Sequence, residues 1–135
     1  FIASDTTDEA PFRQLAARWN SPFFDASTPL HDGMALLCNA SCLIGGRWHP
    51  SILASKGGTP SIMTTANTSK TLGFLKMFSL SEVIFDPFEL DRCSDQIIDI
   101  LQLYISRGET LRSAIRQRAK SYALLAEQNV RACVE

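Results

Sequence analysis

Long apolar runs, a large net charge and a dense set of cysteines are all missing from this 135-residue chain. No apolar stretch approaches the roughly 20 residues that a membrane-spanning helix requires, so the sequence predicts no membrane span. The 13 basic and 14 acidic residues leave a formal net charge of -1, which provides no broad field to attract nucleic acid or a lipid surface. We therefore expect a cytoplasmic protein without a nucleic-acid partner, in which any charge-based recognition is local.

Cysteine and histidine are also scarce. The two histidines, His31 and His49, do not stand at ligand spacing from the cysteines, so the sequence predicts no metal site. The cysteines are too scattered for a disulfide scaffold, and their apolar neighbours indicate reduced thiols that pack like small hydrophobic side chains. These residues are Cys38, Cys42, Cys93 and Cys133.

The chain does have the balance of a soluble globular domain, with 45% apolar and 20% charged residues. Short apolar runs alternate with helical patterns, which is typical of a parallel sheet built from βαβ units. We expect strands at about residues 1–4, 22–25, 42–45, 60–64 and 82–85. The predicted fold is a Rossmann-like, three-layer α/β domain with a mostly parallel sheet of about five strands and helices on both faces.

The last third of the chain has a different pattern. After Pro87 only helical periodicity remains, with one apolar stripe before Gly108 and another on an Arg-rich segment after it. We therefore predict a Rossmann-like donor-binding domain over residues 1–90. The helices over residues 91–135 are expected to pack on that domain or to cross to another one.

The first residues suggest that the chain is part of a longer protein. It opens on Phe1-Ile2-Ala3-Ser4, an apolar run with no Met before it. A natural protein seldom begins with an unprotected strand edge. We expect the chain to be the C-terminal half of a two-domain protein whose N-terminal domain precedes Phe1.

The segment Gly45-Gly46-Arg47-Trp48-His49-Pro50 lies between a predicted buried strand and a helix expected to begin near Pro50. Ligands of open parallel sheets bind outside the carboxyl ends of the strands, where this segment falls. The N–H groups of a helix start, the Arg47 guanidinium and the His49 imidazole all favour an anion there. A carboxylate or phosphate fits best, because the planar guanidinium fork matches either group.

Each of these residues also has a structural alternative. Arg47 could cap a strand end, Trp48 could be a core residue and His49 could be an N-cap, and only their combination favours a functional site. The segment from Thr64 to Lys70 is either a phosphate cradle or a solvated loop with an N-cap. Three more features favour structural roles: Asp32 beside His31 at a helix start, a core position for Trp19, and a solvated helix face made by Arg112, Arg116, Arg118 and Lys120.

A family resemblance follows from these motifs. Residues Leu43-Ile44-Gly45-Gly46-Arg47-Trp48-His49-Pro50-Ser51-Ile52-Leu53-Ala54, then Gly58-Thr59-Pro60, then Asn67-Thr68-Ser69-Lys70 resemble the polysaccharide pyruvyl transferase family. Members of that family are similar to the GT-B glycosyltransferases, which have two Rossmann-like domains. They transfer an enolpyruvate-derived ketal from phosphoenolpyruvate to a sugar. The resemblance covers about residues 20–85.

The resemblance implies a role for each matching residue. Arg47 would bind the carboxylate or phosphate of phosphoenolpyruvate, His49 would be the acid–base residue or a phosphate contact, and Lys70 would be a phosphate partner. The substrate-binding set would also include Gly45, Gly46, Trp48 and Ser69. Phosphoenolpyruvate and a glycan acceptor are the implied partners, with no cofactor beyond the donor substrate. The chain alone would be inactive without its N-terminal domain.

The chemistry of ketal formation agrees with these roles. A proton must reach the methylene carbon of phosphoenolpyruvate, and a histidine with a pKa near the working pH suits that transfer. Fixed positive groups stabilise the departing phosphate. Two other functions use the same helix start. One is the nucleotide-sugar-binding half of a GT-B glycosyltransferase or epimerase, for which Glu82 and Asp86 are weak candidates to bind the ribose, and the other is a non-catalytic anion-binding domain.

Overall fold

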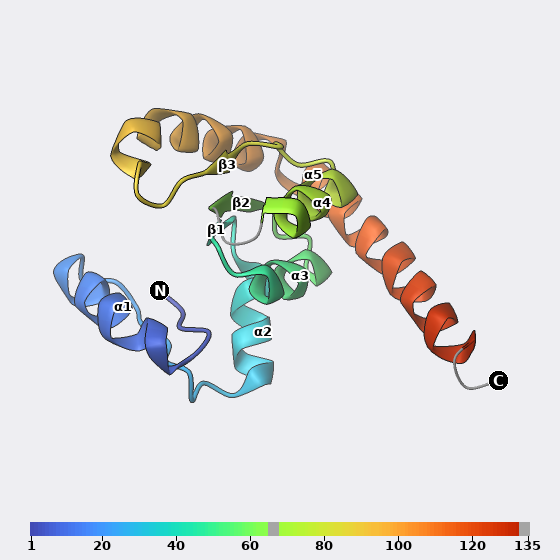
Figure 1. The fold of residues 1–135 in the computed structure, drawn as a ribbon, viewed down its shortest axis with the longest axis horizontal. Coiled ribbons are helices and arrows are strands. Elements are labelled where there is room, and N and C mark those ends of the chain that lie inside the picture. The colour runs from blue at the N-terminus through green and yellow to red at the C-terminus, as the bar shows by residue number, and fades with distance from the viewer. Residues whose placement is uncertain (65–67, 133–135) are drawn as a thin grey trace. The chain divides into compact units, whose positions relative to one another are not determined.

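The computed structural model describes residues 1–64 and 68–132 (Figure 1). Those residues form a small α/β protein with five helices and three short parallel strands. In chain order the elements are α1 (Thr6–Arg18), α2 (Leu30–Asn39), β1 (Leu43–Gly45), α3 (Trp48–Lys56), β2 (Ser61–Thr64), α4 (Thr68–Phe78), β3 (Ile84–Phe85) and α5 (Leu90–Ala132). The chain divides into two compact units, Phe1–Leu36 and Leu37–Glu135, and each is described by itself.

The first unit consists of α1 and the segments that flank it. Asp5 is the N-cap of α1, and its Oδ1 accepts a hydrogen bond of 2.9 Å from the Thr7 N–H, which satisfies a donor that has no partner inside the helix. Ile2 and Phe24 form an isolated parallel bridge, in which Ala3 N donates to Phe24 O at 2.8 Å. The strands predicted at residues 1–4 and 22–25 are therefore reduced to this one bridge.

The prediction for Trp19 is also wrong. Its side chain is 59% exposed and stacks against the ring of Phe1, with 5.9 Å between the ring centroids. Trp19 is the C-cap of α1, beyond the last helical turn, so the helical spacing that suggested a core position no longer applies to it.

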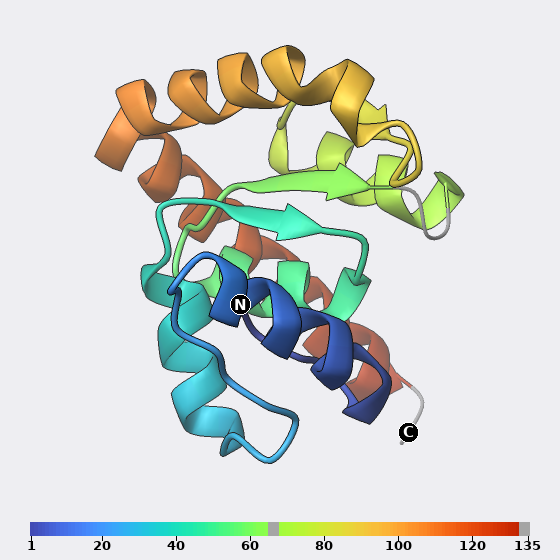
Figure 2. The ribbon, with the colours of Figure 1, turned by 90° about the vertical axis from the view of Figure 1, so that its left-hand side faces the viewer.

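The second unit contains a three-stranded sheet in the order β1-β2-β3. All neighbours are parallel, with Ile44 opposite Ile62 and Met63 opposite Ile84. Helices α3 and α4 form the connections from β1 to β2 and from β2 to β3. Figures 1 and 2 show the sheet between α3 on one side and the first half of α5 on the other.

The prediction of a five-stranded Rossmann-like sheet is wrong. In the described residues the sheet has three strands of 3, 4 and 2 residues, and about two thirds of those residues are helical. The runs at 42–45, 60–64 and 82–85 do form strands, and these are parallel. The two N-terminal runs are apolar enough for strands, but a strand needs a partner along its length. Beyond the single Ile2–Phe24 bridge, these runs have no strand partner in the described residues.

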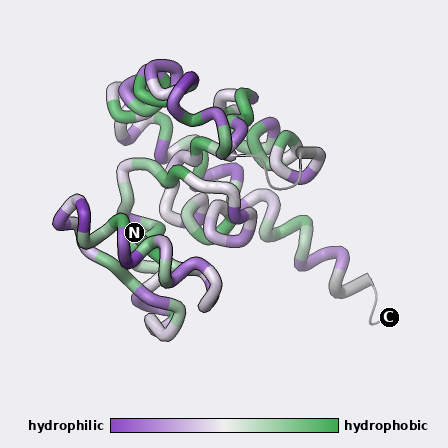
Figure 3. Tube along the Cα trace, turned by 60° about the vertical axis from the view of Figure 1, so that its left-hand side comes forward, coloured by the Kyte–Doolittle hydropathy of each residue, from purple (hydrophilic) through white to green (hydrophobic). Residues whose placement is uncertain are grey.

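Helix α5 closes the core of the second unit. It is interrupted at Gly108, whose φ of 47° and ψ of -129° are not helical and are readily adopted only by glycine. Before the interruption, the hydroxyl of buried Tyr104 accepts a hydrogen bond of 2.8 Å from Ser81 N. After it, Leu111 and Ile115 join the hydrophobic core around Met63. Figure 3 shows apolar and polar segments alternating along this second half of α5.

None of the described helices combines the length and the apolar character that a membrane span requires.

Candidate functional site

The candidate site begins where β1 ends. Gly45 is the last residue of β1, Gly46 forms a bend, and Arg47 is the N-cap of α3 with extended backbone angles of φ -85° and ψ 123°. Helix α3 therefore begins at Trp48, two residues earlier than Pro50. Pro50 is still tolerated because the first N–H groups of a helix have no intrahelical partner for a proline to lose.

The start of α3 has an unusual charge pattern. Residues with side-chain acceptors are preferred at the N-cap, but the arginine at this position offers only donors. No acidic residue lies in the first turn of α3. The positive end of the helix dipole therefore meets a further positive charge instead of a carboxylate. An anion complements a helix start that combines these two positive groups.

The three side chains at the start of α3 are exposed. The rings of Trp48 and His49 meet edge to face, with 5.7 Å between their centroids, and the Trp48 side chain is 37% exposed. The alternatives with Trp48 in the core and His49 as the N-cap are therefore wrong. Both aromatic side chains are accessible to a ligand that binds beside Arg47.

Helix α3 packs against β2 through small side chains. Ser51, Ala54 and Ser55 are its buried residues, and Ala54 is fully inaccessible to solvent. Ser51 Oγ lies 3.2 Å from the carbonyl oxygen of Arg47 and 3.2 Å from the sulfur of Met63. Ser51 thus connects the backbone at the helix start to a core residue of β2.

A second helix starts at the same edge of the sheet. Because β1 and β2 are parallel neighbours, the helices that follow them both begin at the carboxyl edge, as Figure 2 shows for α3. Ser69 and Lys70 lie in the first turn of α4 and are exposed. The predicted phosphate cradle between Thr64 and Lys70 includes residues 65–67, which lie outside the described residues. The fold therefore brings Arg47, Trp48, His49, Ser69 and Lys70 to one edge.

Three other features have local roles. Asp32 lies in the first turn of α2, where its Oδ1 lies 2.9 Å from Nε2 of His31. Asp86 follows β3, but its Oδ1 accepts a hydrogen bond of 2.9 Å from Phe88 N in the adjacent turn. Among the described residues, no group of His, Cys, Asp and Glu side chains is arranged to hold a metal ion.

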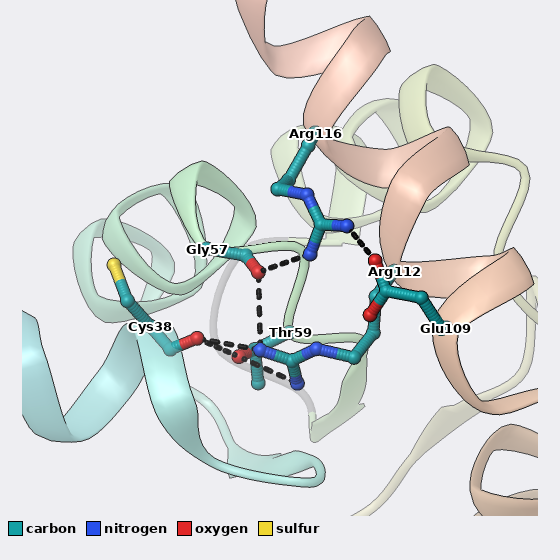
Figure 4. A network of polar contacts seen from close by, with 6 residues as sticks. All are labelled: Cys38, Gly57, Thr59, Glu109, Arg112 and Arg116. Carbon is teal, nitrogen blue, oxygen red and sulfur yellow. Dashed lines mark hydrogen bonds and ion pairs between the residues drawn. The ribbon is translucent and has the colours of Figure 1, made fainter.

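A polar network on the second half of α5 was not predicted. Nη1 of Arg112 donates to the carbonyl oxygen of Ala40 at 2.6 Å. Nη2 of the same side chain donates to those of Cys38 at 2.6 Å and Gly57 at 3.0 Å (Figure 4). Thr59 Oγ1 lies 3.2 Å from the Cys38 oxygen and 3.1 Å from the Ala40 oxygen. These carbonyl oxygens belong to the C-terminal ends of α2 and α3, where orphan acceptors carry partial negative charge.

The neighbouring arginines act in the same way. Arg116 donates to Gly57 O at 3.2 Å and pairs with Glu109, and Arg118 donates at 3.0 Å to Met77 O in the last turn of α4. The prediction of a solvated arginine face is therefore wrong for Arg112 and Arg116, which are half-buried, whereas Arg118 and Lys120 are exposed as predicted. Their acceptors lie 41 to 74 residues away in the sequence, so helical periodicity gives no signal of them.

Two glycines allow this network to form. A Cβ atom on Gly57 would collide with the backbone of Cys38, and one on Gly58 would collide with the backbone of Arg112. Gly58 also has a φ of 83°, which side chains with a Cβ rarely adopt. The Gly57-Gly58 pair therefore ends α3 and also lets α2 and α5 approach it closely.

No family model, curated protein or solved structure matches this chain. The resemblance to pyruvyl transferases therefore stays a prediction that rests on residues 43–54, 58–60 and 67–70.

Proposed function

We propose that the start of α3 binds the phosphate or carboxylate of phosphoenolpyruvate, and that the chain supplies the donor side of pyruvyl transfer to a sugar of a surface polysaccharide. One observation carries the proposal. Arg47 and His49 are exposed at the positive end of α3, directly after the carboxyl end of β1, and no acidic residue lies in that helical turn. A dianionic donor complements this arrangement.

The proposed binding mode uses three kinds of positive group. The Arg47 guanidinium pairs with two oxygens of a phosphate or carboxylate at once, and the first N–H groups of α3 point toward the same anion. Lys70 contributes a point charge from the first turn of α4, at the same edge of the sheet. Phosphoenolpyruvate has two anionic groups, so it can be held at both ends.

In the proposed reaction His49 acts as the general acid. It gives a proton to the methylene carbon, the double-bond electrons of phosphoenolpyruvate form that new C–H bond, and the adjacent carbon becomes oxocarbenium-like. One sugar hydroxyl adds to this carbon, phosphate leaves with the electrons of its C–O bond, and a second hydroxyl closes the ketal. The two hydroxyl protons return to His49 and to phosphate. A positioned acid of this kind contributes about 10² to 10⁴-fold to the rate.

A non-catalytic anion-binding domain is the second candidate. The observation that favours it is the exposure of Trp48 and His49, because catalytic sites ordinarily exclude water around the reacting atoms. The nucleotide-sugar alternative has less support. Its best candidate for a ribose contact, Asp86, already accepts a hydrogen bond from Phe88 N.

Calorimetric titration of the full chain with inorganic phosphate and with phosphoenolpyruvate tests the proposal. Arg47→Ala removes a charge-assisted partner and is expected to weaken phosphoenolpyruvate binding by about 2 to 4 kcal/mol. Arg118→Ala is the matched control, because Arg118 is an exposed arginine that donates to Met77 O in the last turn of α4, at the opposite end of that helix from Lys70. Equal affinity in wild type and Arg47→Ala would refute the proposal.

Turnover separates the two candidates. Phosphate released from phosphoenolpyruvate in the presence of a glycan acceptor and the complete transferase supports catalysis. Binding without any phosphate release under those conditions supports the non-catalytic domain.

A further inference from the structure

Helix α3 carries the proposed anion site, yet little apolar burial fixes its direction. Its buried residues are the small Ser51, Ala54 and Ser55, and the larger Ile52 is 38% exposed. Small side chains remove little apolar area from water, so they stabilise one orientation of a helix only weakly. Hydrogen bonds at the ends of α3 therefore add to what fixes its direction.

The C-terminal end of α3 is fixed by two arginines. Nη2 of Arg112 and Nη1 of Arg116 both donate to Gly57 O, which belongs to the C-cap residue of the helix (Figure 4). Gly58, the next residue, packs on the backbone of Arg112 so closely that a Cβ atom would not fit. The end of α3 is thus held to α5 by hydrogen bonds and by backbone packing.

Arg112 also donates hydrogen bonds to the C-terminal end of α2. The same guanidinium donates to Cys38 O and Ala40 O at 2.6 Å each, so one side chain joins the end of α2, the end of α3 and α5. A planar guanidinium can reach three carbonyl oxygens in fixed directions, whereas a lysine ammonium at the end of its flexible stem cannot reproduce that fork. Arg116 contributes one hydrogen bond to Gly57 O.

We infer that Arg112 is a positioning residue for the anion site, and that it acts along α3 from the opposite end of the helix. This inference rests on the proposed function for what the site binds. Helix α3 has 9 residues and is about 13 Å long, so a tilt of about 10° at its C-terminal end moves its N-terminal end by about 2 Å. A displacement of that size separates Arg47 and His49 from an anion that also contacts α4.

The test compares variants of the full chain by titration with inorganic phosphate at a temperature where circular dichroism shows each to be folded. Arg112→Ala is expected to weaken phosphate binding about 10-fold. Guanidinium chloride at low millimolar concentration is expected to restore part of the affinity by occupying the vacated carbonyl cluster. Arg118→Ala is the matched control, because Arg118 caps the end of α4 from the same helix, and its affinity should stay within about 2-fold of wild type.

A second readout does not depend on phosphate. The indole N–H resonance of Trp48, assigned with Trp48→Phe, is expected to shift in Arg112→Ala and to stay in place in Arg118→Ala. An unchanged Trp48 resonance and unchanged phosphate affinity in folded Arg112→Ala would overturn the inference and leave the proposed function intact. If wild type binds no phosphate, the proposed function fails and the Trp48 resonance alone decides the inference.

Arg112→Lys covers the case in which Arg112→Ala does not fold. It keeps the positive charge but not the three-way fork, so the Trp48 shift and the weaker phosphate binding are expected in this variant too. If neither variant folds even with guanidinium present, Arg112 serves folding alone and the inference is overturned.

Discussion

At the scale of single residues, His49 separates binding from catalysis. His49 is the second residue of α3 and is exposed, and its ring contacts only Trp48 among the aromatic side chains described. Its removal should therefore disturb packing little. An effect of its substitution on turnover would report on chemistry more than on stability.

His49→Gln is expected to keep the fold and most of the donor affinity, because glutamine can still donate a hydrogen bond. Under the proposed function, phosphate release from phosphoenolpyruvate should fall by about 10² to 10⁴-fold, the contribution of a positioned general acid. His31→Gln is the matched control, since His31 is also exposed and pairs only locally with Asp32. Normal turnover in His49→Gln would assign proton transfer to another residue.

Cys42 gives a second residue-scale prediction. Burial raises the pKa of its thiol from 9.0 to about 11, because the thiolate is poorly solvated beside the core. Between pH 9.0 and about 11, the Cys42 thiol therefore stays protonated in the folded protein, whereas it is mostly deprotonated in the unfolded protein. This contribution to stability is complete below pH 9.0 and is lost as the pH rises through about 11.

Urea unfolding between pH 8 and pH 11 tests that prediction. Wild type should lose unfolding free energy across this range, and Cys42→Ala should lose less of it. The buried Tyr104 also has a raised pKa, mainly through burial, and acts in the same direction, so the variant should retain part of the slope. Identical slopes in the two proteins would contradict the assignment to Cys42.

At the scale of elements, the end of α3 is a tightly constrained connection in the second unit. Gly58 combines a φ of 83° with close packing on the backbone of Arg112. The positive φ and the close packing of Gly58 both occur at the end of α3, where Arg112 and Arg116 donate to Gly57 O. A side chain there would strain the backbone and push α5 away from α3.

Gly58→Ala is therefore expected to lower the free energy of unfolding by about 2 kcal/mol or more. Gly73→Ala is the control, because Gly73 lies on an exposed position of α4 and a Cβ atom there would meet nothing within 4 Å. That change should stabilise the protein by about 0.5 to 1 kcal/mol. Thermal or urea unfolding measures both, and a neutral Gly58→Ala would disprove the close approach of α5.

At the scale of the whole molecule, the second unit has its own core. Every residue of the main hydrophobic cluster, from Ile62 to Ile115, lies in residues 37–135. The arginine contacts to Cys38, Ala40, Gly57 and Met77 also lie within that unit. Both the apolar burial and the charge-assisted hydrogen bonds of this unit are therefore internal to it.

A chain of residues 29–135, which keeps α2 whole, is consequently expected to fold. It should show a cooperative thermal transition by circular dichroism and dispersed amide resonances. The Arg112→Ala change in this shorter chain should lower its midpoint, because it leaves buried carbonyl oxygens without their partner. A non-cooperative melt of residues 29–135 would show that the second unit needs residues 1–28.

Local patterns determined the elements that surround the site. The apolar runs at 42–45 and 60–64, the Gly45-Gly46 turn and the helical spacing after it are properties of neighbouring residues, so β1, α3 and β2 could be predicted from the sequence alone. Because parallel neighbours place the following helices at one edge, the starts of α3 and α4 both lie at the carboxyl edge of the sheet.

Only the tertiary structure decided the size of the sheet and the role of the arginines. Phe1–Ser4 and Phe23–Asp25 have the pattern of strands, but strand formation depends on a partner along the whole run, and they form one bridge. Arg112 has the spacing of a solvated helix residue, yet its acceptors are 72 and 74 residues away in the chain. A pattern of nearby residues determines which face of a helix is polar, whereas the packing of distant segments determines what that face contacts.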